Sequence, residues 1–280
     1  MTEPTLASLE PCFRSLQILG NGPGRVPPLD EETPLVVFNT PSGRKVNRRD
    51  IQVLNAKHAG DMDNGRQFVV RTETFDDLWR QRFVALLEDS ASVLKAAIRC
   101  EPTTGLTALY SALQLATQIN AYRMPLRPCL LRAHDMSNRQ PLPCAFHNWL
   151  GERNVALLIQ KQWGRGRLSW ASLPLQETGV FSTNVPRTNP LLALLYLFTK
   201  YEKDREDDFV EGIEVLANVE MRLWYQYADV TSLRRLEPFF FLDRHAQETK
   251  RWWLYSNRSS AYLDTILCRL MLCQQYLQSR

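Results

Sequence analysis

The sequence lacks the long apolar segments of membrane and secreted proteins. Its longest apolar patch, residues 191–198, is far shorter than the roughly 20 residues that a membrane-spanning helix needs. Residues 1–10 lack the basic region and the following apolar stretch of a signal peptide. We therefore expect a soluble cytoplasmic protein with no membrane partner.

Motifs of several common enzyme classes are also missing. The six cysteines form no CxxC pair and do not indicate a disulfide framework. No G-x-S-x-G elbow of a serine hydrolase occurs. The glycine-rich residues 20–24 lack the Lys-Ser/Thr pair and the structural context of a P-loop, so they predict a plain loop. These absences favour a non-catalytic protein with no cofactor apart from the zinc ion considered below.

Lysine is scarce, whereas arginine is abundant. The chain has 7 Lys and 27 Arg, which a GC-rich genome or selection for bidentate phosphate contacts would each explain. The clustering is more informative. Residues 121–170, here called the basic segment, carry seven Arg and one Lys against one Asp and one Glu. Their net charge of +6 exceeds the +4 of the whole chain, which favours a polyanionic partner.

Hydrophobic periodicity predicts an α+β fold. We expect residues 1–186 to hold short strands, two helices and a β-hairpin, and residues 187–280 to be α-helical, as two domains or one continuous fold. The first helix begins at a Thr74 cap and ends before Pro102. The other expected elements are strands at 35–38, 51–54 and 67–72, and helices at 104–122, 191–203, 207–227, 243–255 and 260–278.

The basic segment divides into two parts. Residues 123–150 contain four prolines, which predicts an ordered loop without regular structure. Residues 155–162 and 167–173 are apolar-rich runs on either side of a glycine-rich turn, which predicts a β-hairpin. In a strand, Lys161, Trp163 and Arg165 would share one face.

A basic loop beside an aromatic hairpin is typical of a surface that binds nucleic acid. Arginine and lysine neutralise phosphates, and a tryptophan ring offers a face to an unpaired base. We expect a non-catalytic accessory or regulatory subunit that binds DNA or RNA and other protein subunits. A simpler interpretation is that the tryptophans pack onto the body and the arginines are solvated or ion-paired. The predicted nucleic-acid-binding residues are Arg123, Arg127, Arg132, Arg139, Lys161, Trp163, Arg165, Arg167, Trp170, Lys250 and Arg251.

Two other functions stay open. One is a protein-interaction subunit of a larger assembly, in which the basic and aromatic residues bury against an acidic protein. The other is a metal-dependent phosphodiesterase, for which His58, Asp61 and Asp63 are the visible ligands. The backbone preferences of a turn explain the two aspartates equally well.

Four potential zinc ligands lie within 19 residues of the basic segment. They are Cys129, His134, Cys144 and His147. Two thiolates and two imidazoles could close a tetrahedral zinc site and hold the proline-rich loop in order. Their spacing matches no standard zinc finger, so the alternative is two buried cysteines and two hydrogen-bonded histidines.

Overall fold

The computed structural model describes residues 12–23, 25–26, 28–39, 46–56, 67–133, 135–137, 140–164, 166–177, 188–242 and 251–280. A mixed sheet lies in the N-terminal half and helices dominate the C-terminal half, which confirms the predicted α+β class. None of the described helices is both long and apolar enough to span a membrane.

The chain forms two compact units and passes between them several times. The sequence predicts two domains, residues 1–186 and 187–280, or one continuous fold, and this division stays a prediction. Unit 1 comprises Met1–Ala97, Pro102–Pro125 and Ile159–Leu173, and unit 2 comprises Ile98–Glu101, Leu126–Leu158 and Pro174–Arg280.

Unit 1 is built on a six-stranded sheet in the order β4-β3-β2-β1-β5-β6. Neighbouring strands run parallel except β3 and β4, which are antiparallel. The three strands predicted from the sequence correspond to β2, β3 and β4. The strands are β1 (Phe13–Leu19), β2 (Leu35–Phe38), β3 (Ile51–Asn55), β4 (Phe68–Arg71), β5 (Ala116–Tyr122) and β6 (Leu168–Ser169).

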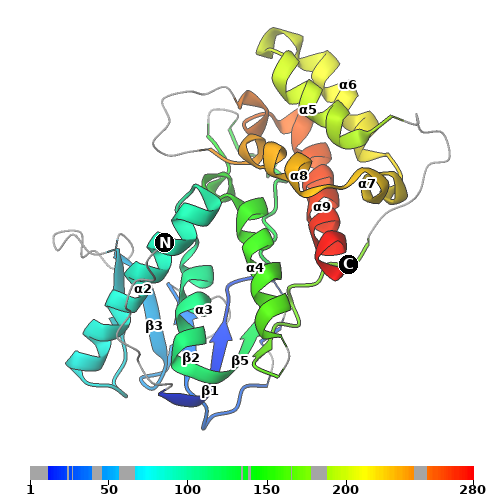
Figure 1. Ribbon diagram of the computed structural model, residues 1–280. Coiled ribbons are helices and arrows are strands. Elements are labelled where there is room, and N and C mark those ends of the chain that lie inside the picture. Colours follow the sequence, from blue (N-terminus) through cyan, green and yellow to red (C-terminus); the bar gives the residue numbers. More distant parts are fainter. Residues whose placement is uncertain are drawn as a thin grey trace. The chain divides into compact units, whose positions relative to one another are not determined.

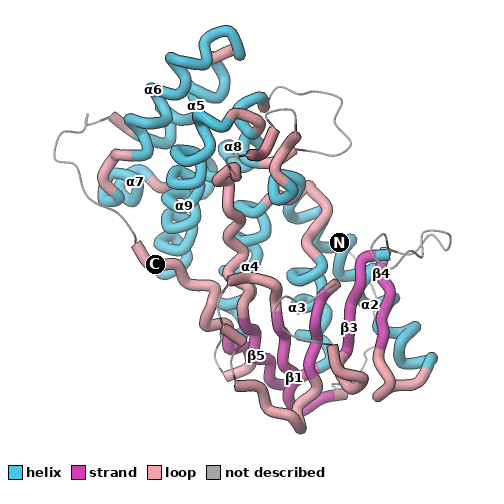
Figure 2. The backbone as a smooth tube through the Cα atoms, turned by 180° about the vertical axis from the view of Figure 1, so that it is seen from behind, coloured by secondary structure: helices cyan, strands magenta, loops and turns pink. Residues whose placement is uncertain are grey.

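Two helices cover one face of this sheet, as Figures 1 and 2 show from opposite sides. Helix α2 (Asp77–Ile98) confirms the first predicted helix, although its cap is Asp76, whose Oδ1 accepts from the amide of Trp79 at 2.8 Å. Helix α3 (Thr104–Leu115) packs against β1, β2 and β3, and its buried residues are mostly apolar.

The predicted helix over residues 104–122 is wrong in its second half. The backbone becomes extended at Ala116, and residues 116–122 form β5 instead of two further helical turns. Strand β5 pairs with β1 from Phe13↔Ala116 to Leu19↔Tyr122. This pairing joins segments about 100 residues apart, so local periodicity could not reveal it.

The predicted β-hairpin over residues 155–173 is also wrong. Residues 149–163 form helix α4 (Trp149–Trp163), and only Leu168–Ser169 is extended, parallel to β5. Along α4, Ala156 and Ile159 are buried whereas Lys161 is exposed. Short apolar runs do not distinguish a strand from a buried helix.

Unit 2 is helical, and its core surrounds α9 (Asn257–Ser279). The predicted helix at 191–203 is confirmed as α5 (Pro190–Lys200), and the one at 260–278 is confirmed as α9. The predicted helix at 207–227 is two helices, α6 (Glu206–Ala217) and α7 (Met221–Tyr227).

Of the predicted helix at 243–255, residues 243–250 lie outside the described residues, and 252–254 form a single 3-10 turn. Unit 2 also contains α8 (Val230–Leu236) and 3-10 turns at Pro143–Phe146, Lys203–Arg205, Glu237–Phe240 and Trp252–Leu254.

Candidate functional site

The carboxyl ends of the parallel strands share one edge of the unit 1 sheet. The chain leaves β1 for β2 on one side, whereas β5 lies on the other side of β1. The ends of β1 and β5 therefore form a topological switch point. Open α/β sheets bind their ligands at this position, just outside the carboxyl ends of the strands.

A glycine-containing loop follows β1 at the switch point. The amide of Gly20 donates to the carbonyl of Tyr122 at 2.8 Å, and that of Gly22 to the carbonyl of Arg123 at 2.9 Å. A Cβ at Gly22 would lie 2.5 Å from the Arg123 carbonyl oxygen, too close for any other residue. Glycine thus lets the loop lie directly against the end of β5.

Side-chain amides bridge the neighbouring strand ends. Asn21, which is exposed, donates from Nδ2 to the carbonyl of Phe38 at 3.2 Å. Asn39 follows β2 with φ 45°, and its Oδ1 accepts from the amide of Asn55 at 3.0 Å. Gln52 donates from Nε2 to the carbonyl of Asn39 at 2.7 Å. The edge is therefore polar and held by bonds to the backbone.

Helix α3 begins at the same edge. Thr103 is its N-cap, and its hydroxyl accepts from the amide of Leu106 at 3.3 Å. A Cβ at Gly105 would touch the Phe38 ring at 3.5 Å and Met124 Cε at 3.4 Å, so the helix starts beside the ends of β2 and β5. The positive end of the helix dipole and its first amides favour an anion there.

The structure gives most arginines of the basic segment an internal partner. Arg123 donates from Nε to the carbonyl of Gly22 at 2.7 Å. Arg127 pairs with Asp264 at 3.5 Å. Arg132 donates from Nη2 to the carbonyls of Ser137 and Gln140, and from Nε to Asn257 Oδ1 at 2.6 Å. These three guanidinium groups hold loops in place.

Arg153 and Arg167 of the basic segment, and Arg251 outside it, follow the same pattern. Arg153 is fully buried and donates to Gln275 Oε1 at 3.0 Å, and burial lowers the pKa of its guanidinium to about 10. Arg167 donates from Nη2 to the carbonyls of Leu113 and Ala116, where α3 ends. Arg251 donates to the carbonyl of Phe241. Arg139, Arg165 and Lys250 lie outside the described residues.

The two tryptophans of the predicted hairpin are not a pair of stacking platforms. Trp170 is 3% exposed and donates from Nε1 to the carbonyl of Met124 at 2.8 Å, so it belongs to the core. Trp163 is half-buried, and the guanidinium carbon of Arg167 lies 4.4 Å from its ring centroid. Lys161 is exposed on α4. Nucleic-acid binding stays a prediction, without the hairpin on which it was based.

The predicted zinc ligands are brought together only in part. The thiol of Cys144 donates to the carbonyl of Cys129 at 3.1 Å, whereas the His147 ring lies against Glu101 and Glu152. His134 lies outside the described residues, as do His58, Asp61 and Asp63. In the part of the chain that the structure describes, no three His, Cys, Asp or Glu residues are grouped to hold a metal ion. Zinc binding stays a prediction.

A histidine–glutamate pair in unit 2 escaped the sequence analysis. His147 Nδ1 lies 3.3 Å from the Glu101 carbonyl oxygen and 3.9 Å from Glu152 Oε1. Glu152 is fully buried, whereas His147 is half-exposed. When Nδ1 donates to the carbonyl, Nε2 becomes the acceptor, which is the arrangement of a general base.

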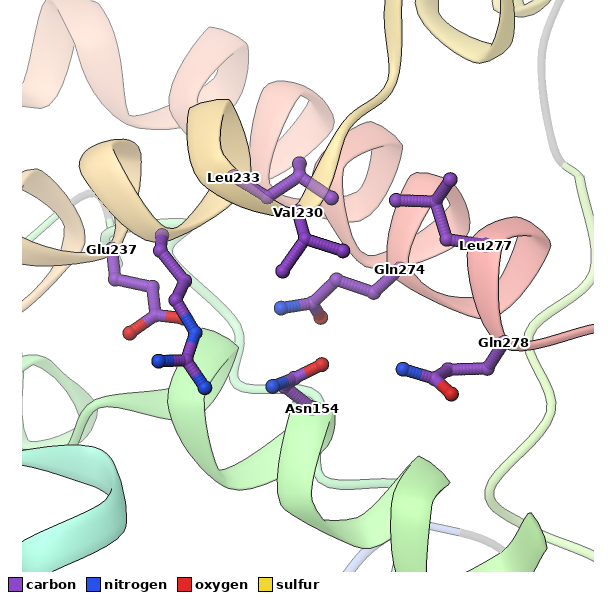
Figure 3. Close-up of a pocket in the computed structure, with 8 residues that line it drawn as sticks. Asn154, Val230, Leu233, Glu237, Gln274, Leu277 and Gln278 are labelled. Carbon is purple, nitrogen blue, oxygen red and sulfur yellow. The ribbon is translucent and has the colours of Figure 1, made fainter.

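Unit 2 also has a small polar pocket (Figure 3). Its enclosed space is about 10 Å³, enough for one water molecule. Gln274 is 3% exposed and donates from Nε2 to the carbonyl of Leu150 at 2.8 Å, while its Oε1 has no hydrogen-bond partner among the described residues. The pocket is lined by Asn154, Val230, Leu233, Arg234, Glu237, Gln274, Leu277 and Gln278.

Comparisons with known proteins give no information about the site, so its interpretation depends on its geometry. No protein-family model, curated protein or solved structure matches the chain.

The switch-point residues could have been suspected from the sequence. Residues 13–24 combine an apolar-rich segment with a glycine- and asparagine-rich turn, which is typical of a first strand and its ligand-binding loop. The segment before the loop was not predicted as a strand. Without a strand before it, the loop gave no sign that it lies at the edge of a sheet.

Proposed function

We propose that unit 1 binds a phosphorylated small molecule of the nucleotide class at the carboxyl edge of its sheet. The observation that carries this proposal is the switch point between β1 and β5, where the Gly20–Gly22 loop and the start of α3 lie at the same edge. The first amides of α3 and the helix dipole suit a phosphate group, whereas the amides of Gly20 and Gly22 donate to the carbonyls of Tyr122 and Arg123. The side-chain amides of the neighbouring strand ends suit the polar groups of a sugar or base.

A titration with matched ligands tests this proposal. Nucleoside mono- and diphosphates, the corresponding nucleosides and inorganic phosphate are added separately to the full chain in a calorimeter. We expect the nucleotides to bind, and the nucleosides to bind at least about tenfold more weakly, because they lack the charge that the helix dipole attracts. If inorganic phosphate binds as tightly as the nucleotides, the site recognises phosphate alone. If no phosphorylated compound binds, the proposal is wrong.

Thr104→Asp separates loss of binding from loss of folding. An aspartate in the first turn of α3 favours the helix by about 0.3–1 kcal/mol, but its charge repels an anionic ligand at the same place. We expect the midpoint of thermal unfolding to stay equal or rise, while nucleotide affinity falls about tenfold or more. Gln118→Glu makes the same charge change at an exposed position near the amino end of β5 and should leave the affinity unchanged.

A second candidate function, acid–base catalysis, rests on the buried Glu152 beside His147. A positioned general base contributes about 10²–10⁴-fold to a rate. Turnover of a ligand that binds beside His147 in unit 2 should therefore fall by at least about 10²-fold in His147→Asn, with unfolding unchanged. Turnover that survives this substitution would remove His147 from the reaction.

The arginines of the basic segment that the structure describes do not require a nucleic-acid partner or a protein partner to explain their positions. Most arginines of the basic segment that the structure describes bond to groups of the protein itself. The exposed Lys161 is the described residue of the basic segment best placed to contact a polyanion. Both functions stay as predictions, and the first is tested through this residue below.

A further inference from the structure

Two free cysteines of unit 2, separated by 15 positions, meet in the proline-rich loop. The Cys144 thiol donates to the carbonyl of Cys129 at 3.1 Å. Cys129 is exposed and Cys144 is half-buried. One thiol therefore faces solvent, and the other lies partly buried beside it and donates to its backbone carbonyl.

The backbone that carries each cysteine is held in place. Next to Cys129, the amide of Leu130 donates to Asp264 Oδ1 on α9 at 2.6 Å. The carbonyl of Cys144 accepts from Trp149 Nε1 on α4 at 2.6 Å. These two bonds hold the backbone at the place where the Cys144 thiol contacts Cys129.

We propose that Cys129 and Cys144 form a thiol pair that closes to an intramolecular disulfide when a hydroperoxide oxidises Cys129. In the first step the Cys129 thiol releases its proton and its sulfur attacks a peroxide oxygen; the O–O bond breaks, sulfenic acid forms, and, when hydrogen peroxide is the oxidant, the hydroxide set free takes up that proton as water. In the second step the Cys144 sulfur attacks the Cys129 sulfur, the S–O bond breaks, and the Cys144 proton leaves with hydroxide as water. Two thiols are oxidised and one peroxide is reduced to two waters.

The different exposure of the two thiols sets the order of the steps. Peroxide reaches Cys129 first because that side chain faces solvent. Cys144 resolves the sulfenic acid before a second peroxide can oxidise it further. The other four thiols offer no equivalent pair: Cys268 and Cys273 are buried, and Cys12 is exposed in unit 1. The half-buried Cys100 donates to the carbonyl of Phe146 at 3.7 Å.

The test is thiol mapping of the full chain after treatment with hydrogen peroxide. The native protein is oxidised, alkylated, digested and analysed by mass spectrometry before and after reduction with dithiothreitol. We expect the loss of the Cys129 and Cys144 thiols, a peptide that links residues 129 and 144 within one chain, and recovery of both thiols on reduction. Cys12→Ser removes another exposed thiol and should leave this link unchanged, whereas Cys129→Ser should abolish it and leave Cys144 reduced.

Three outcomes would overturn the proposal. One is Cys129 oxidised to sulfinic acid while Cys144 keeps its thiol. Another is cross-linking between chains in place of the link within one chain. The third is about one equivalent of zinc in the purified protein that protects both thiols from alkylation, because the pair would then be a metal site.

Discussion

Gly22 and Arg123 bond to each other in both directions. The Gly22 amide donates to the Arg123 carbonyl at 2.9 Å, and Arg123 Nε donates back to the Gly22 carbonyl at 2.7 Å. Arg123 itself has φ 51°, a left-handed conformation that is uncommon for a residue other than glycine. The loop after β1 and the end of β5 are thus built as one unit at the proposed ligand site.

The close approach predicts that Gly22 is sensitive to the smallest substitution. In Gly22→Ala the new methyl group would lie 2.5 Å from the Arg123 carbonyl oxygen, so the loop or the strand end must shift. We expect the free energy of unfolding to fall by about 1–3 kcal/mol, the range of a local steric conflict, with a loss of nucleotide binding. Urea unfolding and calorimetry measure the two effects.

Gly105→Ala is the matched control for stability. Its Cβ would meet neighbours at 3.4 Å or more, which is ordinary contact, and alanine favours a helix over glycine by about 1 kcal/mol. This variant should unfold at the same urea concentration or a higher one. If Gly22→Ala is as stable as Gly105→Ala, the loop is less constrained than its geometry indicates.

Substitutions of Arg167 and Lys161 should distinguish an arginine that stabilises the fold from a lysine that is free to contact a polyanion. Arg167 donates to two carbonyls at the end of α3, so Arg167→Ala should lower the free energy of unfolding by about 1–3 kcal/mol. Lys161 is exposed, and Lys161→Ala should leave unfolding within about 0.5 kcal/mol.

The salt dependence of nucleic-acid affinity completes this comparison. If nucleic acid binds at α4, Lys161→Ala makes the plot of log affinity against log salt shallower by about one charge. Unchanged slopes for the variant, or no binding at low salt, would argue against a nucleic-acid interface there.

The partly buried Glu237 predicts a pH-dependent stability. Burial raises the pKa of its carboxyl above the ordinary value of 4.5, against the lowering effects of Asn148, Arg234 and Arg99. A carboxyl with a raised pKa in the folded state stabilises the fold below the unfolded pKa, and this contribution is lost as the pH rises through the folded pKa. Glu237→Gln should therefore be more stable than the parent at pH 7 and equal to it below about pH 4.5.

Urea unfolding at both pH values measures this difference. Glu211→Gln removes the same charge from an exposed position on α6, and it serves as the control for the change in net charge. A Glu237→Gln variant that is less stable than the parent at pH 7 would show that the carboxylate is stabilised by its partners instead.

The elements that the sequence predicts correctly are those with strong local signals. The apolar patterns and the boundary residues of β2, α2 and α9 can be recognised in the local sequence alone. Strand β5 is different, because its extended form depends on pairing with β1. Its residues continue the apolar pattern of α3, so only the tertiary structure shows where the helix stops.

The candidate site was missed for a related reason. Residues 121–170 carry a net charge of +6, but a sequence does not show which of its arginines are exposed to solvent. Arg153 is fully buried, and Arg123, Arg132 and Arg167 bond to backbone carbonyls. Apart from Arg123, the residues at the switch point are uncharged, and residues 20–24 predicted only a plain loop. The strand order of the folded protein places them together.

Hydrogen–deuterium exchange with and without a bound nucleotide tests the central claim most directly. If the ligand binds at the carboxyl edge of the sheet, exchange should slow at residues 20–22, 103–106 and 123, and these effects should disappear in Thr104→Asp. Protection confined to α4, or to the pocket around Gln274, with no change at the switch point, would contradict the proposed site.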